Sequence, residues 1–499
     1  MLNLSKTFKE KFSLDAHIGA SIKDNRFDEL SVYGPIAGAP NIFNVVNLDK
    51  SQKKTPKTGW HEQTQSFFYS LELGWKSQLF VTTTGRNDWA SQLANSPQKS
   101  FFYPSVGVSW LPSSTFNFPE KFNYLKIRAS WASVANPFPR ELTIATHPYD
   151  DTISGWDDKS NYPIGQLYPE RTKTWELGFD ARFLHGFTLS ASWYRADTYN
   201  QTFNPNLSAS SGYSDIYIQT GHVRNTGVEA SLGYDHQWKN WNWNSQFTFS
   251  WNKNKIIELC KEWYNPITEE TITMNRLQIS KLGRAKFILK EGGSMGDLYS
   301  TTDLRRDDKG NIEIDEGGNV VVEDNLPDMK LGSVFPDYNL AWRNSVSWKN
   351  LNLGFLVTAR IGGIVNSLTQ ANMDLFGVSE ATAAARDAGG ALVNGRSLVN
   401  PETWYTAIAS QGGIPQYYTY SATNVRLQEL SLGYTIPRKW LHNICSITVS
   451  FVGRNLWMMY CKAPFDPEAV ASTNNFYQGM DYFMMPSTRN LGFNINIKF

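Results

Sequence analysis

The chain has 499 residues, and its 47 Lys and Arg balance 46 Asp and Glu, so the formal net charge is +1. That balance excludes the broad basic surface on which nucleic-acid binding depends. Aromatic residues make up 14% and charged residues 19%, and no run of about 20 apolar residues occurs, which excludes disordered chains and helical membrane spans. A large β protein remains.

Apolar side chains alternate with hydroxyl and amide side chains along much of the chain, as in the final segment that ends in Phe499. In a strand, such alternation places the two sets on opposite faces. If one face meets lipid, six of the apolar residues are expected there: Phe187, Leu189, Trp193, Phe247, Phe249 and Trp251.

Counting these segments predicts about 14 strands of roughly 9–12 residues, whereas soluble strands most often have about 5–6 residues. Tilted strands that cross a bilayer need about 9–11 residues. In chain order the predicted strands are 12–21, 65–75, 77–86, 103–111, 124–133, 173–183, 187–198, 226–236, 243–253, 338–348, 352–361, 425–435, 446–456 and 489–499.

The connections between these strands alternate between long and short. The longest are 254–337 and 362–424, and among the shortest are 184–186 and 349–351. Outer-membrane barrels have short periplasmic turns and long extracellular loops. We therefore predict an all-β fold, an antiparallel transmembrane β-barrel whose function resides in its long loops. Alternation alone also fits a soluble antiparallel β protein with an apolar core.

Motifs for catalysis or metal binding are missing from the sequence. No Walker loop, dinucleotide fingerprint or nucleophile elbow occurs, and His61-Glu62 lacks the second His of a metalloprotease. Asp307 to Asn311 suggests a calcium loop, but Arg305 stands where an EF-hand needs Asp, so a hairpin turn is the simpler interpretation. The three cysteines, Cys260, Cys445 and Cys461, are too widely spaced for a zinc site. We predict no enzyme, no cofactor and no metal.

Aromatic residues in the long connections are the better candidates for a binding site. Aromatic faces stack on sugar rings or apolar peptide side chains, and nearby polar groups fix the orientation. The alternative is that these residues form small cores within the loops. The predicted substrate-binding residues are Trp156, Asp157, Trp263, Tyr264, Trp404, Tyr405, Tyr417 and Tyr418.

Several strings occur in one order along nearly the whole chain. They include Gly85-Arg86-Asn87-Asp88-Trp89, Leu125-Lys126-Ile127-Arg128-Ala129-Ser130-Trp131, Thr174-Trp175-Glu176-Leu177-Gly178, Asn225-Thr226-Gly227-Val228-Glu229, Val425-Arg426-Leu427-Gln428-Glu429-Leu430, Gly453-Arg454-Asn455-Leu456 and Phe465-Asp466-Pro467-Glu468. The ordered set resembles the SusC/RagA-type TonB-dependent transporters of Bacteroidetes outer membranes.

The resemblance implies that residues 1–499 are one domain, the C-terminal part of a plugged barrel of about 22 strands. It implies a multi-pass protein in the outer-membrane lipid of a Gram-negative cell. It also implies uptake of oligosaccharides or peptides together with a SusD-like lipoprotein, and coupling to the TonB complex through N-terminal parts. We expect the sequence to lack the plug, the signal peptide and the leading strands of the barrel. The strand 12–21 would then expose an unpaired sheet edge, and the fragment expressed alone should misassemble.

Three charged residues in the matched strings, Arg86, Arg128 and Glu176, alternate with apolar neighbours and are therefore expected to face the lumen. Phe499 is predicted to be an assembly signal, because barrels that resemble this chain end in Phe. The alternative for Phe499 is membership of the aromatic girdle at the periplasmic interface.

Two other functions compete with transport. An outer-membrane enzyme would need a Ser/His/Asp-type set at the outer rim, and no spacing supports one. A surface adhesin or glycan-binding β protein without a pore remains the alternative. The sequence leaves open the substrate, calcium binding, the oligomeric state, and whether the chain is a truncated reading frame or a piece of a longer protein.

Overall fold

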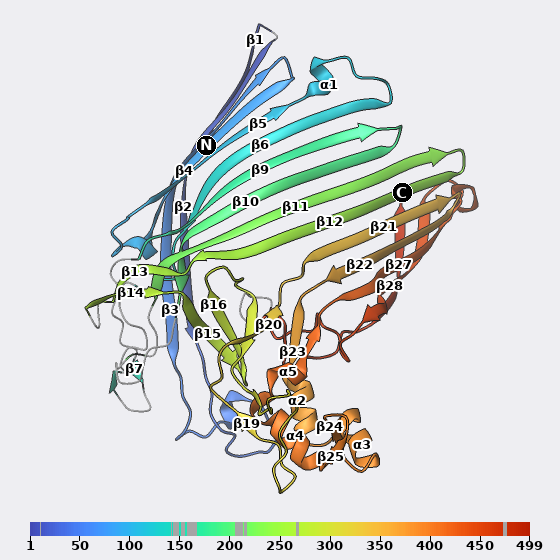
Figure 1. Cartoon of the computed structure of the whole chain (residues 1–499). Coiled ribbons are helices and arrows are strands. Elements are labelled where there is room, and N and C mark those ends of the chain that lie inside the picture. Colours follow the sequence, from blue (N-terminus) through green and yellow to red (C-terminus); the bar gives the residue numbers. More distant parts are fainter. Residues whose placement is uncertain are drawn as a thin grey trace.

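A computed structural model describes residues 1–9, 11–140, 142, 149–150, 155–156, 167–204, 213, 217–265, 269–472 and 477–499. Its dominant feature is one antiparallel sheet of 15 strands, in the order β1-β2-β3-β4-β5-β6-β9-β10-β11-β12-β21-β22-β27-β28-β30 (Figure 1). Consecutive strands of the sheet are neighbours throughout, so the topology is a meander. The predicted all-β antiparallel fold is confirmed.

The strands of the sheet are long, as crossing a bilayer requires. Their bounds are β1 (Leu2–Phe8), β2 (Phe12–Leu30), β3 (Lys57–Trp75), β4 (Leu79–Ala90), β5 (Phe101–Trp110), β6 (Phe122–Asn136), β9 (Glu170–Phe183), β10 (Phe187–Phe203), β11 (Ile218–Trp238), β12 (Trp241–Glu258), β21 (Tyr338–Trp348), β22 (Leu351–Ile361), β27 (Asn424–Ile436), β28 (Ser446–Cys461) and β30 (Asn490–Lys498).

The prediction of about 14 strands missed β1 and therefore the position of the N-terminal edge. Strand β1 has only seven residues, and Lys6 interrupts its apolar alternation. It pairs with β2 from Leu2 opposite Ile18 to Phe8 opposite Phe12, so the edge lies at β1 and not at 12–21. Strands β2 and β3 are also longer than predicted, because beyond Ser21 polar residues occupy both faces and the alternation disappears.

One face of the sheet is apolar and exposed. Large side chains such as Trp193, Phe247 and Trp342 have 38%, 42% and 44% of their surface exposed, and the described core does not contain them. Leu189, Phe249 and Trp251 are half-buried among neighbours on the same face. An apolar surface of this extent is stable when it faces lipid, as the sequence predicted.

The short connections lie together along one edge of the sheet, and the long connections gather at the opposite end (Figure 1). The long ones contain further elements: β7 (Tyr149–Asp150), β8 (Gly155–Trp156), β13 (Cys260–Asn265), β14 (Glu270–Met274), β15 (Arg276–Leu282), β16 (Ala285–Lys290), β17 (Asp297–Ser300), β18 (Asp303–Leu304), β19 (Val322–Glu323), β20 (Met329–Ser333), β23 (Ile364–Ser367), α2 (Leu368–Leu375), α3 (Glu380–Asp387), β24 (Ala391–Val393), β25 (Ser397–Val399), α4 (Pro401–Ala409), α5 (Pro415–Tyr418), β26 (Thr419–Ser421) and β29 (Met480–Asp481).

Three long connections pack into a single body, which we call the loop body (259–337, 362–423 and 462–489). A small sheet joins β26, β23 and β29, and β23 runs parallel to β29. One buried cluster takes Phe287 and Leu298 from the first connection, Leu368 from the second and Met480 from the third. Among the described helices, none is both long and apolar enough to cross a membrane.

Candidate functional site: the polar wall and the loop body

Polar side chains form a row across five strands on the face opposite the apolar one. In register, Ser192 on β10 lies opposite Glu229 on β11, which lies opposite Ser250 on β12. Ser250 lies opposite Asn339 on β21, and Asn339 lies opposite Arg360 on β22. Because strand residues two apart share a face, the neighbouring Ser and Thr side chains extend this row into a surface, which we call the polar wall.

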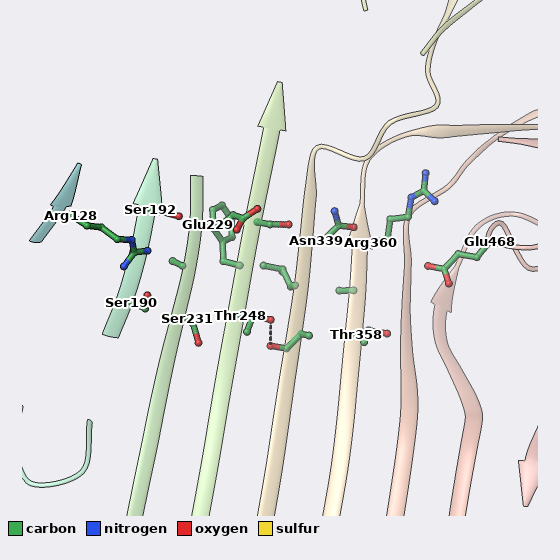
Figure 2. Close-up of a pocket in the computed structure, with 16 residues that line it drawn as sticks. Arg128, Ser190, Ser192, Glu229, Ser231, Thr248, Asn339, Thr358, Arg360 and Glu468 are labelled. Atoms are coloured by element: carbon green, nitrogen blue, oxygen red, sulfur yellow. Dashed lines mark hydrogen bonds between the residues drawn. The ribbon is translucent and has the colours of Figure 1, made fainter. Parts of the chain in front are cut away.

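The polar wall is hollowed into a cavity of about 550 Å³. Figure 2 shows Arg128 at one side of it, Glu229 and Asn339 between, and Arg360 and Glu468 at the other side. Hydroxyl groups line the floor, and Thr248 Oγ1 donates a long hydrogen bond of 3.5 Å to the carbonyl oxygen of Ala341. Cations, anions and hydroxyls therefore line one open hollow, which suits a polar solute.

Arg128 and Glu176, two residues expected to face the lumen, lie together on the polar face. Arg128 Nη1 is 2.7 Å from Asp180 Oδ2, and Arg128 Nε is 3.7 Å from Glu176 Oε1. A side chain on Gly178 would place its Cβ 2.8 Å from the guanidinium carbon of Arg128. The glycine thus leaves space for the arginine to lie flat across the strand.

Arg86, the third residue of that group, lies on β4 within another polar cluster. Its Nε is 2.6 Å from Asp88 Oδ1, and its Nη2 donates to Ser66 Oγ at 2.8 Å. The Tyr103 hydroxyl donates to the same aspartate. These contacts give Arg86 a defined orientation, and its part in transport stays a prediction.

Glu468 reaches the cavity because a buried ion cluster fixes the connection that carries it. Arg426 on β27 contacts Asp466 and also lies 3.3 Å from Glu468 Oε2, and its Nη1 donates to Asn455 Oδ1 at 3.1 Å. Burial raises the pKa of Asp466, but hydrogen bonds from Arg426, Ser487 and the Glu468 backbone, together with the charge of Arg426, outweigh it, so the pKa is lowered and the carboxylate stays ionised. Three of the strings that carried the resemblance, those containing Arg426, Asn455 and Asp466, meet at this cluster.

Four of the predicted substrate-binding aromatics pack in the core of the loop body. Trp404 on α4 meets Tyr417 on α5 edge to face, with ring centroids 5.9 Å apart. Tyr418 is only 2% exposed, and its hydroxyl donates to Asp374 Oδ2 at 3.0 Å. Tyr405 lies at the edge of this core, where it lines a cavity of about 410 Å³ between α2, α3 and α4. The contacts give these four a packing role, and substrate contact stays a prediction.

The other predicted residues lie elsewhere. Tyr264, 56% exposed, belongs to the hairpin of β13 and β14, as does Trp263, whose side chain lies outside the described residues. Trp156 falls in β8, also without a described side chain, and Asp157 lies outside the described residues. Phe499 follows β30 and is 92% exposed.

The hydroxyl and amide residues of the polar wall were missed as a site. Alternation alone places Ser192, Ser250 and Asn339 on one face of their strands, but the register between strands is needed to bring them together. Glu229 stood in a matched string without being singled out. In the Asp307–Asn311 segment, the Asp307 carboxylate accepts hydrogen bonds from Asn311, which confirms the predicted turn. The described residues contain no group of three or more His, Cys, Asp or Glu suited to hold a metal.

Residues 2–456 match the TonB-dependent receptor-like β-barrel family. The chain belongs to this family. Among similar proteins, TonB-dependent receptor P3 of Formosa agariphila is 26% identical over 547 residues, covering 100% of the chain and 52% of that protein. TonB-dependent receptor SusC of Bacteroides thetaiotaomicron is 21% identical over 404 residues, covering 75% of the chain and 38% of that protein.

Among solved structures, the RagAB peptide importer in its open-open state superimposes with a TM-score of 0.78 at 18% identity, covering 100% of the chain and 54% of that chain. The chain thus spans about half the length of the relatives that it matches. As a β-barrel of the TonB-dependent receptor family, the sheet lies in an outer membrane, with its apolar face in lipid and its short turns on the periplasmic side.

Proposed function

We propose that the chain forms part of the wall of a TonB-dependent importer, and that a polar nutrient passes along the polar wall. The observation that carries this proposal is the cavity in which Arg128, Glu229, Arg360 and Glu468 surround hydroxyl groups on the face opposite the lipid. A barrel that served only as an adhesin would have no need of a hollowed, charged inner wall.

Peptides are the substrate class that this cavity favours. Cations and anions alternate along it, so the carboxylate and ammonium groups of a peptide each find a partner, and the hydroxyls and Asn339 can bond its amides. A neutral oligosaccharide would use the hydroxyls but offer no counter-charge to Glu229 and Arg360, which form no ion pair among the described residues, whereas Arg128 and Glu468 already contact charged partners. Oligosaccharides remain the second candidate, because aromatic residues such as Tyr264 and Tyr405 reach the surface of the loop body.

A SusD-like lipoprotein is the proposed partner at the extracellular end. Four apolar side chains around the helices of the loop body are exposed by 61–75%: Phe376, Val378, Leu392 and Leu398. Exposed apolar clusters of this kind mark protein–protein contacts. Replacing Phe376 and Val378 by Ser should reduce co-purification of the lipoprotein, whereas the same change at exposed Leu184, in a periplasmic turn, should not. Equal recovery with both variants would rule out this contact surface.

Binding to the natural protein that contains this chain tests the substrate class. Calorimetry with a mixture of short peptides should detect binding. Arg360→Gln should weaken the peptide affinity about tenfold or more, because a hydrogen bond to a charged group contributes about 1.5–3 kcal/mol. Arg343→Gln is the matched control, since Arg343 lies on the neighbouring strand β21, does not line the cavity and pairs with Glu429 on β27. Binding of neutral oligosaccharides alone, unaffected by Arg360→Gln, would refute the peptide proposal.

A further inference from the structure

The short turns of the large sheet carry an unusual share of positive charge. The seven connections 9–11, 76–78, 111–121, 184–186, 239–240, 349–350 and 437–445 contain eight Lys and Arg but only two Glu, and no Asp. The remainder of the chain has 39 Lys and Arg against 44 Asp and Glu, so its net charge is negative. We call the eight cations the basic rim: Lys9, Lys11, Lys76, Lys121, Lys239, Lys349, Arg438 and Lys439.

The cations of the basic rim are exposed and unpaired. All eight are exposed, and within the described part of the chain none forms an ion pair. Three arginines of the strands behave in the opposite way, because Arg86, Arg128 and Arg426 each contact a carboxylate. These three charges are therefore neutralised within the protein, whereas charge on the rim is left for a partner.

Backbone hydrogen bonds join neighbouring turns, so the rim is continuous along the edge that Figure 1 shows. The Lys76 amide donates to the Lys11 carbonyl oxygen at 2.6 Å, and the Lys349 amide donates to that of Asn240 at 2.9 Å. The Leu184 amide donates to the Lys121 carbonyl oxygen at 2.7 Å. The cations are thus held in a row at one level.

That level is the membrane interface, because girdle aromatics lie directly beside the cations. The Lys76 ammonium lies 5.0 Å from the ring centre of Trp75, and the Lys349 ammonium lies 5.1 Å from that of Trp348. Both tryptophans belong to the apolar face, where they are 41% and 43% exposed. Lysines beside such rings extend their ammonium groups to the headgroup level while their stems stay in the apolar region.

The turn 437–445 has the same character. The 3-10 helix Arg438–Leu441 presents Trp440, 69% exposed, directly after Arg438 and Lys439, and Ile444 follows at 71% exposed. A short element that combines cations with exposed apolar side chains suits the boundary between headgroups and acyl chains.

Backbone conformation also indicates that lysine is needed for its side chain. Lys9, Lys76 and Lys349 have φ values of 48°, 49° and 52°. Gly, Asn and Asp adopt this left-handed conformation in hairpin turns at lower cost than lysine does. Turn geometry alone therefore does not account for lysine at these three positions.

We propose that the basic rim binds the anionic phosphate headgroups of phospholipids in the periplasmic leaflet of the outer membrane. The rim offers unpaired cations at headgroup height, in a row, beside the aromatic girdle. Each basic residue at an anionic lipid surface contributes about fivefold to association. This interaction is independent of the transported solute, so it stands whether or not the proposed import function does.

Electron spin resonance tests the proposal on the natural protein that contains this chain. The purified protein is reconstituted in phosphatidylcholine membranes with a trace of spin-labelled phosphatidylglycerol or, in parallel, spin-labelled phosphatidylcholine. The wild type should immobilise the anionic label in preference to the neutral one by severalfold, and added salt should reduce that preference. The rim variant carries Lys76→Gln, Lys121→Gln, Lys239→Gln, Lys349→Gln, Arg438→Gln and Lys439→Gln. In this variant the ratio of immobilised anionic label to immobilised neutral label should fall toward one.

A matched variant removes the same charge from exposed lysines of the long connections: Lys50→Gln, Lys53→Gln, Lys261→Gln, Lys281→Gln, Lys309→Gln and Lys462→Gln. It should keep the wild-type ratio. If the rim variant fails to fold, judged by heat-modifiable migration, the pair Lys76→Gln and Lys349→Gln with a salt titration replaces it. Equal association of both labels with the wild type would overturn the proposal and point to a soluble anionic partner. An unchanged ratio in the folded rim variant would also overturn it.

Discussion

Arg426 and Asp466 form a bidentate ion pair although they lie 40 residues apart in the chain. Arg426 Nη2 is 2.7 Å from Asp466 Oδ1, and Nη1 is 3.2 Å from Oδ2. The two side chains are only 5% and 9% exposed. This pair joins strand β27 to the connection that brings Glu468 to the cavity, so it links the barrel wall to the candidate site.

Removing one partner of this pair should be costly. Arg426→Met leaves the Asp466 carboxylate buried without its partner, which typically costs about 3–5 kcal/mol. The expected result is protease cleavage in 462–489 and weaker solute binding, while the β-barrel still migrates as a folded protein. Combining Arg426→Met with Asp466→Leu should recover much of the protease resistance. Equal resistance of the wild type and Arg426→Met would show that the connection is held by other contacts.

A second ion cluster makes the loop body sensitive to acid. Arg276 and Lys290 lie 2.6 Å and 2.9 Å from Asp328 Oδ2. The pKa of Asp328 lies well below its usual range. The hydrogen bonds from Arg276 are the largest cause of this lowering, and burial acts in the opposite direction. A carboxylate with a lowered pKa in the folded state adds stability that is complete above its unfolded pKa of about 3.9 and is lost as the pH falls below that value.

Limited proteolysis of the loop body between neutral pH and about pH 3 measures this effect. Protection should decline as the pH falls, and Asp328→Asn should lower it by about 2 kcal/mol at neutral pH and flatten the pH dependence. Asp308→Asn, at an exposed turn position, is the control and should leave the profile unchanged. A profile that Asp328→Asn does not alter would mean that other groups titrate.

The aromatic residues of the loop body separate into packing and contact positions. Tyr418→Phe removes the donor to Asp374 Oδ2 and should destabilise the loop body by about 1–3 kcal/mol, measurable by hydrogen exchange, without a direct effect on solute affinity. Tyr405→Ala, at the edge of the second cavity, should lower affinity by about 1–2 kcal/mol if that cavity holds solute. Unchanged affinity in Tyr405→Ala would reduce Tyr405 to a packing role.

How far the sequence predicts this molecule depends on the range of the interactions involved. Alternation is local, so Phe247, Phe249 and Trp251 could be assigned to one face, and the long connections could be assigned to one end. β1 was missed because Lys6 interrupts a strand of seven residues. The loop body depends on contacts between distant segments, such as Leu368 with Met480, and no local pattern in the sequence encodes them. For the same reason the aromatics could not be divided between packing and binding.

The terminal residue carries a prediction about biogenesis. Phe499 ends the exposed apolar row of Leu491, Phe493, Ile495 and Ile497. If Phe499 only joins the girdle, Phe499→Leu should cost at most about 1 kcal/mol, because most of the apolar area remains. If assembly factors bind it, Phe499→Leu and deletion of Phe499 should both sharply reduce membrane insertion in cells. Refolding in detergent should then stay close to that of the wild type. Normal insertion of both variants would leave only the girdle role.

Uptake by cells tests the central claim most directly. Cells that carry the natural protein should accumulate a labelled peptide in a manner that requires TonB, and Arg360→Gln should reduce accumulation about tenfold while Arg343→Gln leaves it near the wild-type level. Both variants should reach the outer membrane in equal amounts, so that the difference reports on the polar wall. Peptide accumulation that persists without TonB, or that the two variants reduce equally, would contradict an importer whose solute moves along this wall.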